Sequence, residues 1–243
     1  MIPLASEQEI QASYSRSDVA ADYVARRFTS ALHQLLHKRQ VNAVQRLIDR
    51  TRPGRILEIA PGPARLTRDL RSSGLLVPLE FNESMIQQGR MVCGSAHWVR
   101  GNGFQLPFAD SFDVVYSFRF VRHFHRADRQ RLYGEIRRSL RSGGYFIMDA
   151  VNERISRPLR EAHPEAYPIY DKLYRPDDLT AELKEMGFEI VELRPVQKHY
   201  NWQWRSQINI GPRANWLNNL LVRLLERLPA RDGLEWIVTC RRA

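Results

Sequence analysis

Residues 55–67 read RILEIAPGPARLT, and this stretch decides the fold. The apolar run at 55–60 predicts a buried strand, the Pro-Gly-Pro sequence at 61–63 predicts a turn, and 64–70 alternates as a helix does. A strand, a turn of small residues and a helix start bring backbone N–H groups close to a ligand. The stretch therefore favours a nucleotide-like ligand above the turn, although the same geometry can serve packing alone.

Strands and helices alternate at least four times along the chain. Further strands are expected at 75–81, 97–100, 112–117, 145–150, 188–195 and 234–240, and helices at 17–50, 83–91, around 132–140, 177–186 and 216–228. This alternation predicts an α/β fold with a doubly wound, mostly parallel sheet and right-handed crossovers. Pro78 has no N–H to donate, so a bulge or a half-paired end is expected in its strand. Residues 151–175 are expected to form a long irregular connection of the kind that often serves as a lid or substrate wall.

The composition is that of a soluble folded protein, with 43% apolar and 26% charged residues among 243. No apolar run approaches the roughly 20 residues that cross a bilayer, and the first residues show no secretory signal. Two distant cysteines, Cys93 and Cys240, suggest a reducing compartment, so a cytoplasmic location is expected. The net charge of +10 suits an anionic partner, but a basic proteome or a solubility bias would give the same value.

Two polar residues follow the first turn at distances that suit a nucleoside. Glu80 ends the next strand, roughly 20 residues past the turn, where an acid can accept hydrogen bonds from both ribose hydroxyls. Asn102, between Gly101 and Gly103, carries a donor and an acceptor that suit an adenine edge. Each has a plainer interpretation, since an acid at a strand end is usually solvated and Asn-Gly is an ordinary turn.

Four segments in this order resemble the class I S-adenosylmethionine-dependent methyltransferases, and in particular the branch with the ubiquinone and menaquinone C-methyltransferases and many small-molecule enzymes. They are EIAPGPARLT (58–67), PLEFNESM (78–85), GNGFQLPFADSFDVVYS (101–117) and RRSLRSGGYFIMDA (137–150). The resemblance implies a seven-stranded sheet with an antiparallel last strand, N-terminal helices and an irregular cap. It divides the chain into an N-terminal helical cap (1–50), a cofactor-binding core (51–150), and a cap insertion with a C-terminal strand pair (151–243).

The resemblance also implies S-adenosylmethionine as the cofactor, with S-adenosylhomocysteine as its product. Glu58 would help to hold the methionine amino group, and Glu80 would hold the ribose. The other implied cofactor contacts are Ala60 and Gly62 in the turn, Thr67, Phe81 beside the adenine, Asn102 and Gly103 at the adenine edge, Ser117 near the methionine end, and Tyr23 on a helix that folds over the cofactor.

The turn departs from the family pattern of three glycines, because it carries Ala60, Gly62 and Ala64. Alanine is small enough for the turn to survive, provided that neither alanine needs a positive φ. At the adenine position Asn102 replaces the usual aspartate, and its amide oxygen can still accept from the exocyclic amine of adenine. The dinucleotide dehydrogenases share the strand, turn and acid, but this chain lacks their G-x-G-x-x-G pattern.

Direct in-line methyl transfer needs a positioned acceptor and little water, and it needs a general base only if the acceptor loses a proton. His123, shortly after the fourth strand, is the candidate base, with helix capping or packing as the alternative. Arg119 and Arg122 suit an anionic acceptor or, alternatively, pairing with acids. Tyr167 and Tyr170 suit the wall of an acceptor pocket or plain packing.

The resemblance thus implies a methyltransferase acting on a small molecule or lipid. An RNA or protein methyltransferase stays open, although no nucleic-acid module is recognised, as does a regulatory protein that binds the cofactor without turnover. No metal site is expected, because His33 and His37 lack the glutamate of the zinc-protease motif. The leucine-rich helix and its arginines leave contact with a membrane surface through 216–231 open. The sequence fixes neither the acceptor and its reacting atom nor the oligomeric state.

Overall fold

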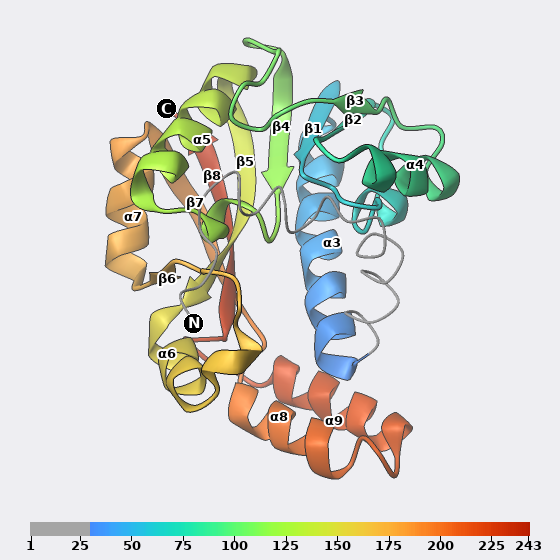
Figure 1. The fold of residues 1–243 in the computed structure, drawn as a ribbon, viewed down its shortest axis with the longest axis vertical. Helices are drawn as coiled ribbons and strands as arrows, with labels where there is room; N and C mark the ends of the chain where they lie inside the picture. The colour runs from blue at the N-terminus through green and yellow to red at the C-terminus, as the bar shows by residue number, and fades with distance from the viewer. Residues whose placement is uncertain (1–29) are drawn as a thin grey trace.

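The computed structural model describes residues 30–243, which form a sheet with helices on both faces (Figure 1). The strands are β1 (Arg55–Ile59), β2 (Leu75–Glu80), β3 (Val99–Arg100), β4 (Phe112–Ser117), β5 (Leu140–Asn152), β6 (Leu173–Tyr174), β7 (Phe188–Val196) and β8 (Glu235–Arg242). The helices are α3 (Ala31–Thr51), α4 (Glu83–Val92), α5 (Arg126–Ser139), α6 (Glu153–Ala162), α7 (Pro176–Glu185), α8 (Tyr200–Asn209) and α9 (Asn215–Arg227). Short 3₁₀ turns cover Thr67–Asp69, Val121–His123 and Pro164–Ala166.

The strand order is β3-β2-β1-β4-β5-β8-β7, with the two-residue strand β6 beside β5. β1 pairs in parallel with β2 on one side and with β4 on the other, so the winding of the sheet reverses between β1 and β4. β8 runs antiparallel to both of its neighbours, β5 and β7. The predicted doubly wound α/β fold with an antiparallel last strand is therefore confirmed. In such a sheet, ligands bind outside the carboxyl ends of the strands at the reversal.

The two faces of the sheet are covered by different helices. Ile56 and Val114 pack with α3 on one face, whereas Leu57 and Val115 pack with α5 and α7 on the other. All four side chains are fully buried, which explains why these strands read as continuous apolar runs rather than as alternating ones. The core on both faces fixes β1 and β4 side by side and so fixes the loops that follow them.

The prediction of a helix at 64–70 is wrong. Only Thr67–Asp69 form a single 3₁₀ turn, and Ala60, Gly62 and Ala64 all have a left-handed backbone conformation. Left-handed residues cannot be part of a right-handed helix, so the chain leaves the turn only after Ala64. The turn is therefore longer than its Pro-Gly-Pro sequence predicts.

Two expectations for the second half of the chain also need correction. The connection at 151–175 contains helix α6 and the short strand β6 rather than irregular chain throughout. Helix α8 was not among the expected helices, because it buries the polar side chains of Gln203 and Ser206 and exposes two tryptophans. An apolar stripe that faces a core is what a sequence pattern detects, and α8 has none.

Pro78 lies in β2 without a bulge. It pairs with Glu58 of β1 in regular register, while β3 pairs with β2 only at Leu79 and Glu80. The backbone groups of Leu79 face β1, since its carbonyl accepts from the Ala60 N–H, so the proline nitrogen one residue earlier faces β3. The expected half-paired strand is confirmed. The N–H that Pro78 lacks would face β3, and β3 pairs with β2 only at Leu79 and Glu80.

Helices α8 and α9 lie side by side beyond the sheet, next to the start of α3 (Figure 1). Each packs against α3 as well as against the other. Within residues 30–243, no helix has the length and apolar character needed to cross a bilayer.

Candidate active site

A cavity opens at the carboxyl ends of β1, β2 and β4, where the winding of the sheet reverses. Its empty space is about 990 Å³, including the part that is open to solvent. The wall includes Glu58, Ala60, Gly62, Arg65, Glu80, Phe81, Asn102, Gly103, Arg119 and Phe120. The turn, the acid after β2 and the Gly-Asn-Gly segment predicted to meet one ligand therefore line one cavity.

The turn after β1 forms the floor of this cavity. Ala60, Gly62 and Ala64 have φ values of 55°, 59° and 64°. The expectation that neither alanine needs a positive φ is therefore wrong, and the chain holds two alanines in a conformation that costs an L-residue about 1–2 kcal/mol each. A Cβ added at Gly62 would meet nothing within 4 Å, so the space above the turn is open to a ligand.

Replacing Ala60 by glycine should stabilise the protein. The relief of left-handed strain, about 1–2 kcal/mol, exceeds the entropy that glycine adds to the unfolded chain, about 0.4–1 kcal/mol. Ala60 is only half-buried, so no large void results. In thermal unfolding we expect a higher Tm for Ala60→Gly, whereas Ala96→Gly, a half-buried alanine outside the left-handed region, should lower it. A lower Tm for Ala60→Gly would contradict the strain assigned to the turn.

Glu80 joins the turn to the end of β2. One carboxylate oxygen accepts from the Gly62 N–H at 3.0 Å, and the other accepts from the Phe81 and Asn82 N–H groups at 2.9 Å each. Burial raises the pKa of this carboxyl, and the three backbone hydrogen bonds oppose the rise. The carboxylate therefore fixes the shape of the cavity wall and keeps lone pairs that can accept from ligand hydroxyls.

Glu58 is a buried acid under the same cavity. Its Oε2 accepts from the Thr67 hydroxyl at 2.5 Å and from the Tyr116 hydroxyl at 2.7 Å. Burial raises its pKa to about 7, although the hydrogen bonds from Thr67 and Tyr116 and the charge of Arg65 act to lower it. A cation bound nearby would favour the ionised form, as expected for a group that holds an ammonium.

Phe81, directly after β2, and residues 101–103, directly after β3, form one part of the cavity wall. Phe81 is about half exposed on the cavity wall. The Asn102 side-chain oxygen accepts from the Phe104 N–H at 2.9 Å, so it holds its own loop at the cavity wall. A Cβ at Gly103 would lie 3.2 Å from both Ile59 and Phe120, which explains the glycine there.

Not every predicted contact lies on the cavity wall. Thr67 and Ser117 are buried and absent from it; Thr67 donates to Glu58, and the Ser117 hydroxyl donates to the Ile59 carbonyl at 2.9 Å. Both position the end of β1, and their contacts with a cofactor stay predictions. Tyr23 lies outside the described residues.

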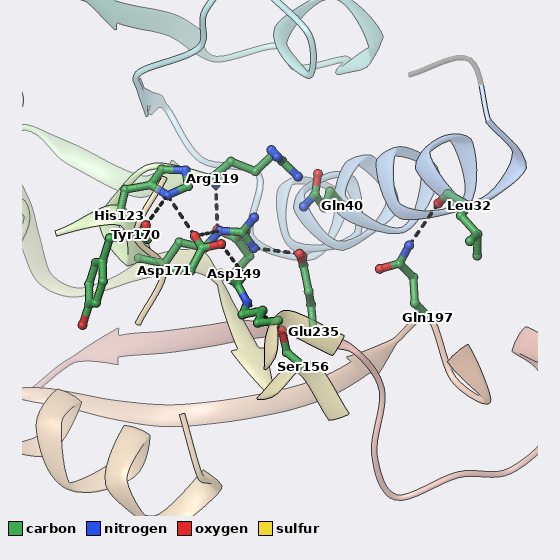
Figure 2. Close-up of polar contacts among 12 residues, drawn as sticks. Leu32, Gln40, Arg119, His123, Asp149, Ser156, Tyr170, Asp171, Gln197 and Glu235 are labelled. Carbon is green, nitrogen blue, oxygen red and sulfur yellow. Dashed lines mark hydrogen bonds and ion pairs between the residues drawn. The ribbon is translucent and has the colours of Figure 1, made fainter. Parts of the chain in front are cut away.

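Arg119, at the end of β4, does line the cavity. Its φ of 58° is left-handed, and its N–H donates to Asp149 Oδ1 at 2.7 Å. Its buried Nε has no hydrogen-bond partner in the part of the chain that the structure describes, and the same holds for Nε2 of Gln40 on α3. Figure 2 shows the Arg119 side chain extending toward the helix that carries Gln40. These two donors suit an oxygen atom of a bound molecule.

Arg122 is not a cavity residue but the centre of a buried ion cluster, and Figure 2 labels the three acids of this cluster, Asp149, Asp171 and Glu235. The Arg122 guanidinium lies 2.8 Å from Asp149, 3.0 Å from Asp171 and 2.7 Å from Glu235. Burial works against its charge, but the three carboxylates outweigh burial and raise its pKa well above the usual value. The structure thus places Arg122 in the alternative that the sequence left open, pairing with acids, and not at an acceptor.

His123 belongs to the same cluster. Its Nδ1 lies 2.8 Å from Asp171 and 3.0 Å from the Tyr170 carbonyl oxygen, and its side chain is absent from the cavity wall. Tyr170 stacks near His125, and Tyr167 packs against the Arg160 guanidinium, so neither ring lines the cavity. The base role of His123 and the acceptor roles of the two tyrosines stay predictions.

Sequence reasoning did not identify several residues that hold the cavity wall in position. Tyr116 lies opposite Glu58 in the β1–β4 register, so strand pairing would have pointed to their hydrogen bond. Arg65 lines the cavity and donates to the Gln40 oxygen at 2.8 Å, a contact between the turn and α3 that no local pattern reveals. Asp149 ends a segment already noted for its sequence, but its partner Arg122 is distant along the chain.

A family model described as a methyltransferase domain matches residues 57–148, the range that contains the turn, Glu80 and Asn102. Residues 57–148 therefore form a methyltransferase domain of the class I S-adenosylmethionine-dependent kind. The fold agrees. The structure of magnesium protoporphyrin IX methyltransferase from Synechocystis PCC 6803 with bound S-adenosylhomocysteine matches with a TM-score of 0.66 at 12% identity, covering 98% of this chain and 100% of that one.

Two relatives are more similar to this chain in sequence than that structure is. The 24-methylenesterol C-methyltransferase 2 of Oryza sativa is 28% identical over 194 residues, which cover 73% of this chain and 53% of the relative. The ubiquinone/menaquinone biosynthesis C-methyltransferase of Vibrio parahaemolyticus is 29% identical over 131 residues, covering 49% of each. The chain therefore spans about half the length of the curated relatives it matches.

Proposed function

We propose that this chain transfers a methyl group from S-adenosylmethionine directly to a small-molecule or lipid acceptor. The observation that carries the proposal is that the left-handed turn, the Glu80 carboxylate and the Asn102 amide line one cavity at the reversal of the sheet. Sterol and quinone C-methyltransferases among the relatives support an apolar small-molecule acceptor.

The residues present fit that cofactor. Gly62 leaves open space above the turn, Glu80 offers acceptors for ribose hydroxyls, and Phe81 offers an exposed ring beside Asn102. When bound, the cofactor supplies a methyl group already activated on a sulfonium. The work left to the chain is to hold the acceptor atom in line and to exclude water.

The acceptor side of the cavity is aromatic, with the guanidinium of Arg119 as a polar donor. Phe104, Phe120 and Phe124 line it and pack edge to face, with centroids of the closest pairs 5.0 and 5.1 Å apart. These rings keep water out, while the unpartnered Nε of Arg119 can donate to an oxygen of the acceptor. The proposed acceptor is therefore an apolar molecule with at least one carbonyl, carboxylate or phenolic oxygen.

The direct test is calorimetry with S-adenosylmethionine and S-adenosylhomocysteine, followed by incubation with methyl-labelled cofactor and fractionated metabolite and lipid extracts. We expect both compounds to bind and label to enter an apolar fraction. Binding without label in any fraction would favour a regulatory protein, and label in RNA or protein would favour the other alternative. No binding of either compound would overturn the proposal.

Cofactor affinity should decrease as the pH is lowered, because Glu58 then takes up a proton. In the free protein its pKa is about 7, and an ammonium group binds the ionised form better. Lowering the pH from 7.5 to 6 reduces the ionised fraction, so the Kd should rise about eightfold. In calorimetry Glu58→Gln should bind more weakly and lose this dependence. A parental Kd that is flat across this range would show that Glu58 does not meet the cofactor's charge.

A further inference from the structure

Helices α8 and α9 form a hairpin (residues 200–228) whose outer surface is apolar. Seven of the twelve exposed large apolar side chains in the described part of the chain lie on it, and they are between 45% and 71% exposed. They are Trp202, Trp204, Ile208, Trp216, Leu220, Leu224 and Leu228. On α9, Trp216, Leu220, Leu224 and Leu228 follow each other at intervals of four residues, so they form one stripe along the helix.

The contacts between the two helices of the hairpin are mainly polar, while Val222 of α9 packs against apolar residues of α3. Ser206 of α8 donates to the Asn218 side-chain oxygen at 2.9 Å, and Gln203 donates to Glu226 at 3.2 Å. Glu226 also lies 3.3 Å from Arg39 of α3 and is almost fully buried. Two helices that meet through Gln, Ser, Asn and Glu side chains, and that direct Trp and Leu outward, reverse the usual pattern of a water-facing helix pair.

This reversal suits an apolar medium outside the hairpin. A surface in contact with lipid is apolar, while polar groups find partners between the helices. The two helices have 10 and 13 residues, too few to cross a bilayer, which takes about 20. The hairpin can therefore lie in the interface of a membrane but cannot span it.

The charge of the hairpin indicates which lipid headgroups it would bind. Residues 198–231 contain six Lys and Arg and a single acid, Glu226, which is buried. Arg223 and Arg227 are exposed within the apolar stripe of α9, and Arg205 lies over the Trp202 ring at 5.2 Å. Exposed tryptophan beside arginine is the composition of segments that bind at the level of anionic headgroups.

We propose that the α8–α9 hairpin docks this protein on a bilayer surface that carries anionic phospholipids. Trp202, Trp216 and the leucines of the stripe would enter the interface, and Arg223 and Arg227 would meet lipid phosphates. The surface lies outside the cavity, so the inference stands apart from methyl transfer and goes beyond it. It also gives the protein access to acceptors that partition into membranes.

The test is co-sedimentation of the full chain with vesicles of phosphatidylcholine, with and without about 30% phosphatidylglycerol. We expect binding to the anionic vesicles at least tenfold tighter than to the neutral ones. For Arg223→Gln/Arg227→Gln we expect binding about thirtyfold weaker than the parent's, at roughly 1 kcal/mol for each charge. Trp216→Ser/Leu220→Ser should abolish the binding. A blue shift of tryptophan emission on adding vesicles should accompany it in the parent.

Matched controls change the same residue types elsewhere on the surface. Met91→Ser/Val92→Ser removes two exposed apolar side chains on α4, and Arg71→Gln/Arg90→Gln removes two exposed charges. Both should bind vesicles as the parent does. Cofactor affinity, measured on every variant, reports whether the fold and the cavity are intact.

The proposal is overturned if the parent stays in the supernatant with both vesicle types, or if the hairpin variants bind as tightly as the controls. It is also overturned if sedimentation of the parent shows a dimer that the hairpin variants convert to a monomer, because a second copy would then cover the stripe.

Discussion

Glu80→Gln should weaken S-adenosylmethionine binding by about a hundredfold or more, since it removes charge-assisted hydrogen bonds worth about 1.5–3 kcal/mol each. The carboxylate accepts from three backbone N–H groups, one at Gly62 and two at Phe81 and Asn82. An amide of the same shape places an NH₂ against one of these donors. The turn and the loop after β2 would then separate at the point where the ribose is expected.

Calorimetry at pH 7.5 measures the effect, with Glu83→Gln as the control. Glu83 follows three residues later on the exposed first turn of α4 and lies 3.7 Å from Arg100, so its loss should change the Kd less than threefold. A Glu80→Gln variant that keeps its far-ultraviolet circular dichroism and binds within threefold of the parent would remove Glu80 from the cofactor site. It would also remove the main support for the proposed function.

The elements that the sequence revealed are those that local chemistry specifies. The strand Phe112–Ser117 was predicted at its observed bounds because a buried parallel strand is a continuous apolar run. Glu80 was found because it ends a strand roughly 20 residues past the turn, and Asn102 because its amide carries the donor and acceptor that suit an adenine edge. Both line one cavity in the structure, while their contacts with a cofactor stay predictions.

The elements that the sequence did not reveal depend on long-range partners. The sequence left Arg122 open between an anionic acceptor and pairing with acids. Its three carboxylate partners come from β5, β8 and the segment before β6. No residue near Arg122 in the sequence indicates these partners. The backbone of Ala60 and Ala64 is a second case, because alanine gives no local signal for a left-handed conformation that the surrounding strands impose.

The ion cluster holds together the far wall of the cavity. Arg122 and His123 contact Asp171, and the Arg119 N–H donates to Asp149, so the loop after β4 is tied to β5 and to the segment before β6. The Arg122 carbonyl also accepts from the Lys172 N–H at 2.8 Å. The loop that carries the cavity residues Arg119 and Phe120 is therefore positioned by buried charges.

Arg122→Met should destabilise the protein by about 3–5 kcal/mol, because it leaves buried carboxylates without their shared cation. The pH dependence of this loss has a definite sign. In the parent, Arg122 and its neighbours hold the pKa of Asp171 far below its usual value against the effect of burial, so its stabilisation is present at neutral pH and is lost only under acid conditions. In the variant, Asp171 keeps its contacts with Arg160 and His123. The buried carboxylates of Asp149 and Glu235, however, lose the cation that they share with Asp171. Burial without a cation disfavours the charged form of a carboxylate. The protonated forms of Asp149 and Glu235 are then favoured on folding, and stability increases as the pH is lowered from neutrality.

Urea unfolding at pH 8 and at pH 5.5 separates this prediction from a plain packing defect. The difference between parent and Arg122→Met should be largest at pH 8 and should shrink by more than about 1 kcal/mol at pH 5.5. Arg126→Met breaks an exposed pair with Glu185 and should cost less than about 1 kcal/mol at both pH values. Adding Glu235→Gln to Arg122→Met should restore part of the lost stability, because it removes one of the buried negative charges that Arg122 neutralises in the parent. An equal loss at both pH values, with no recovery in the double variant, would mean that Arg122 contributes through its side-chain packing and not through its charge.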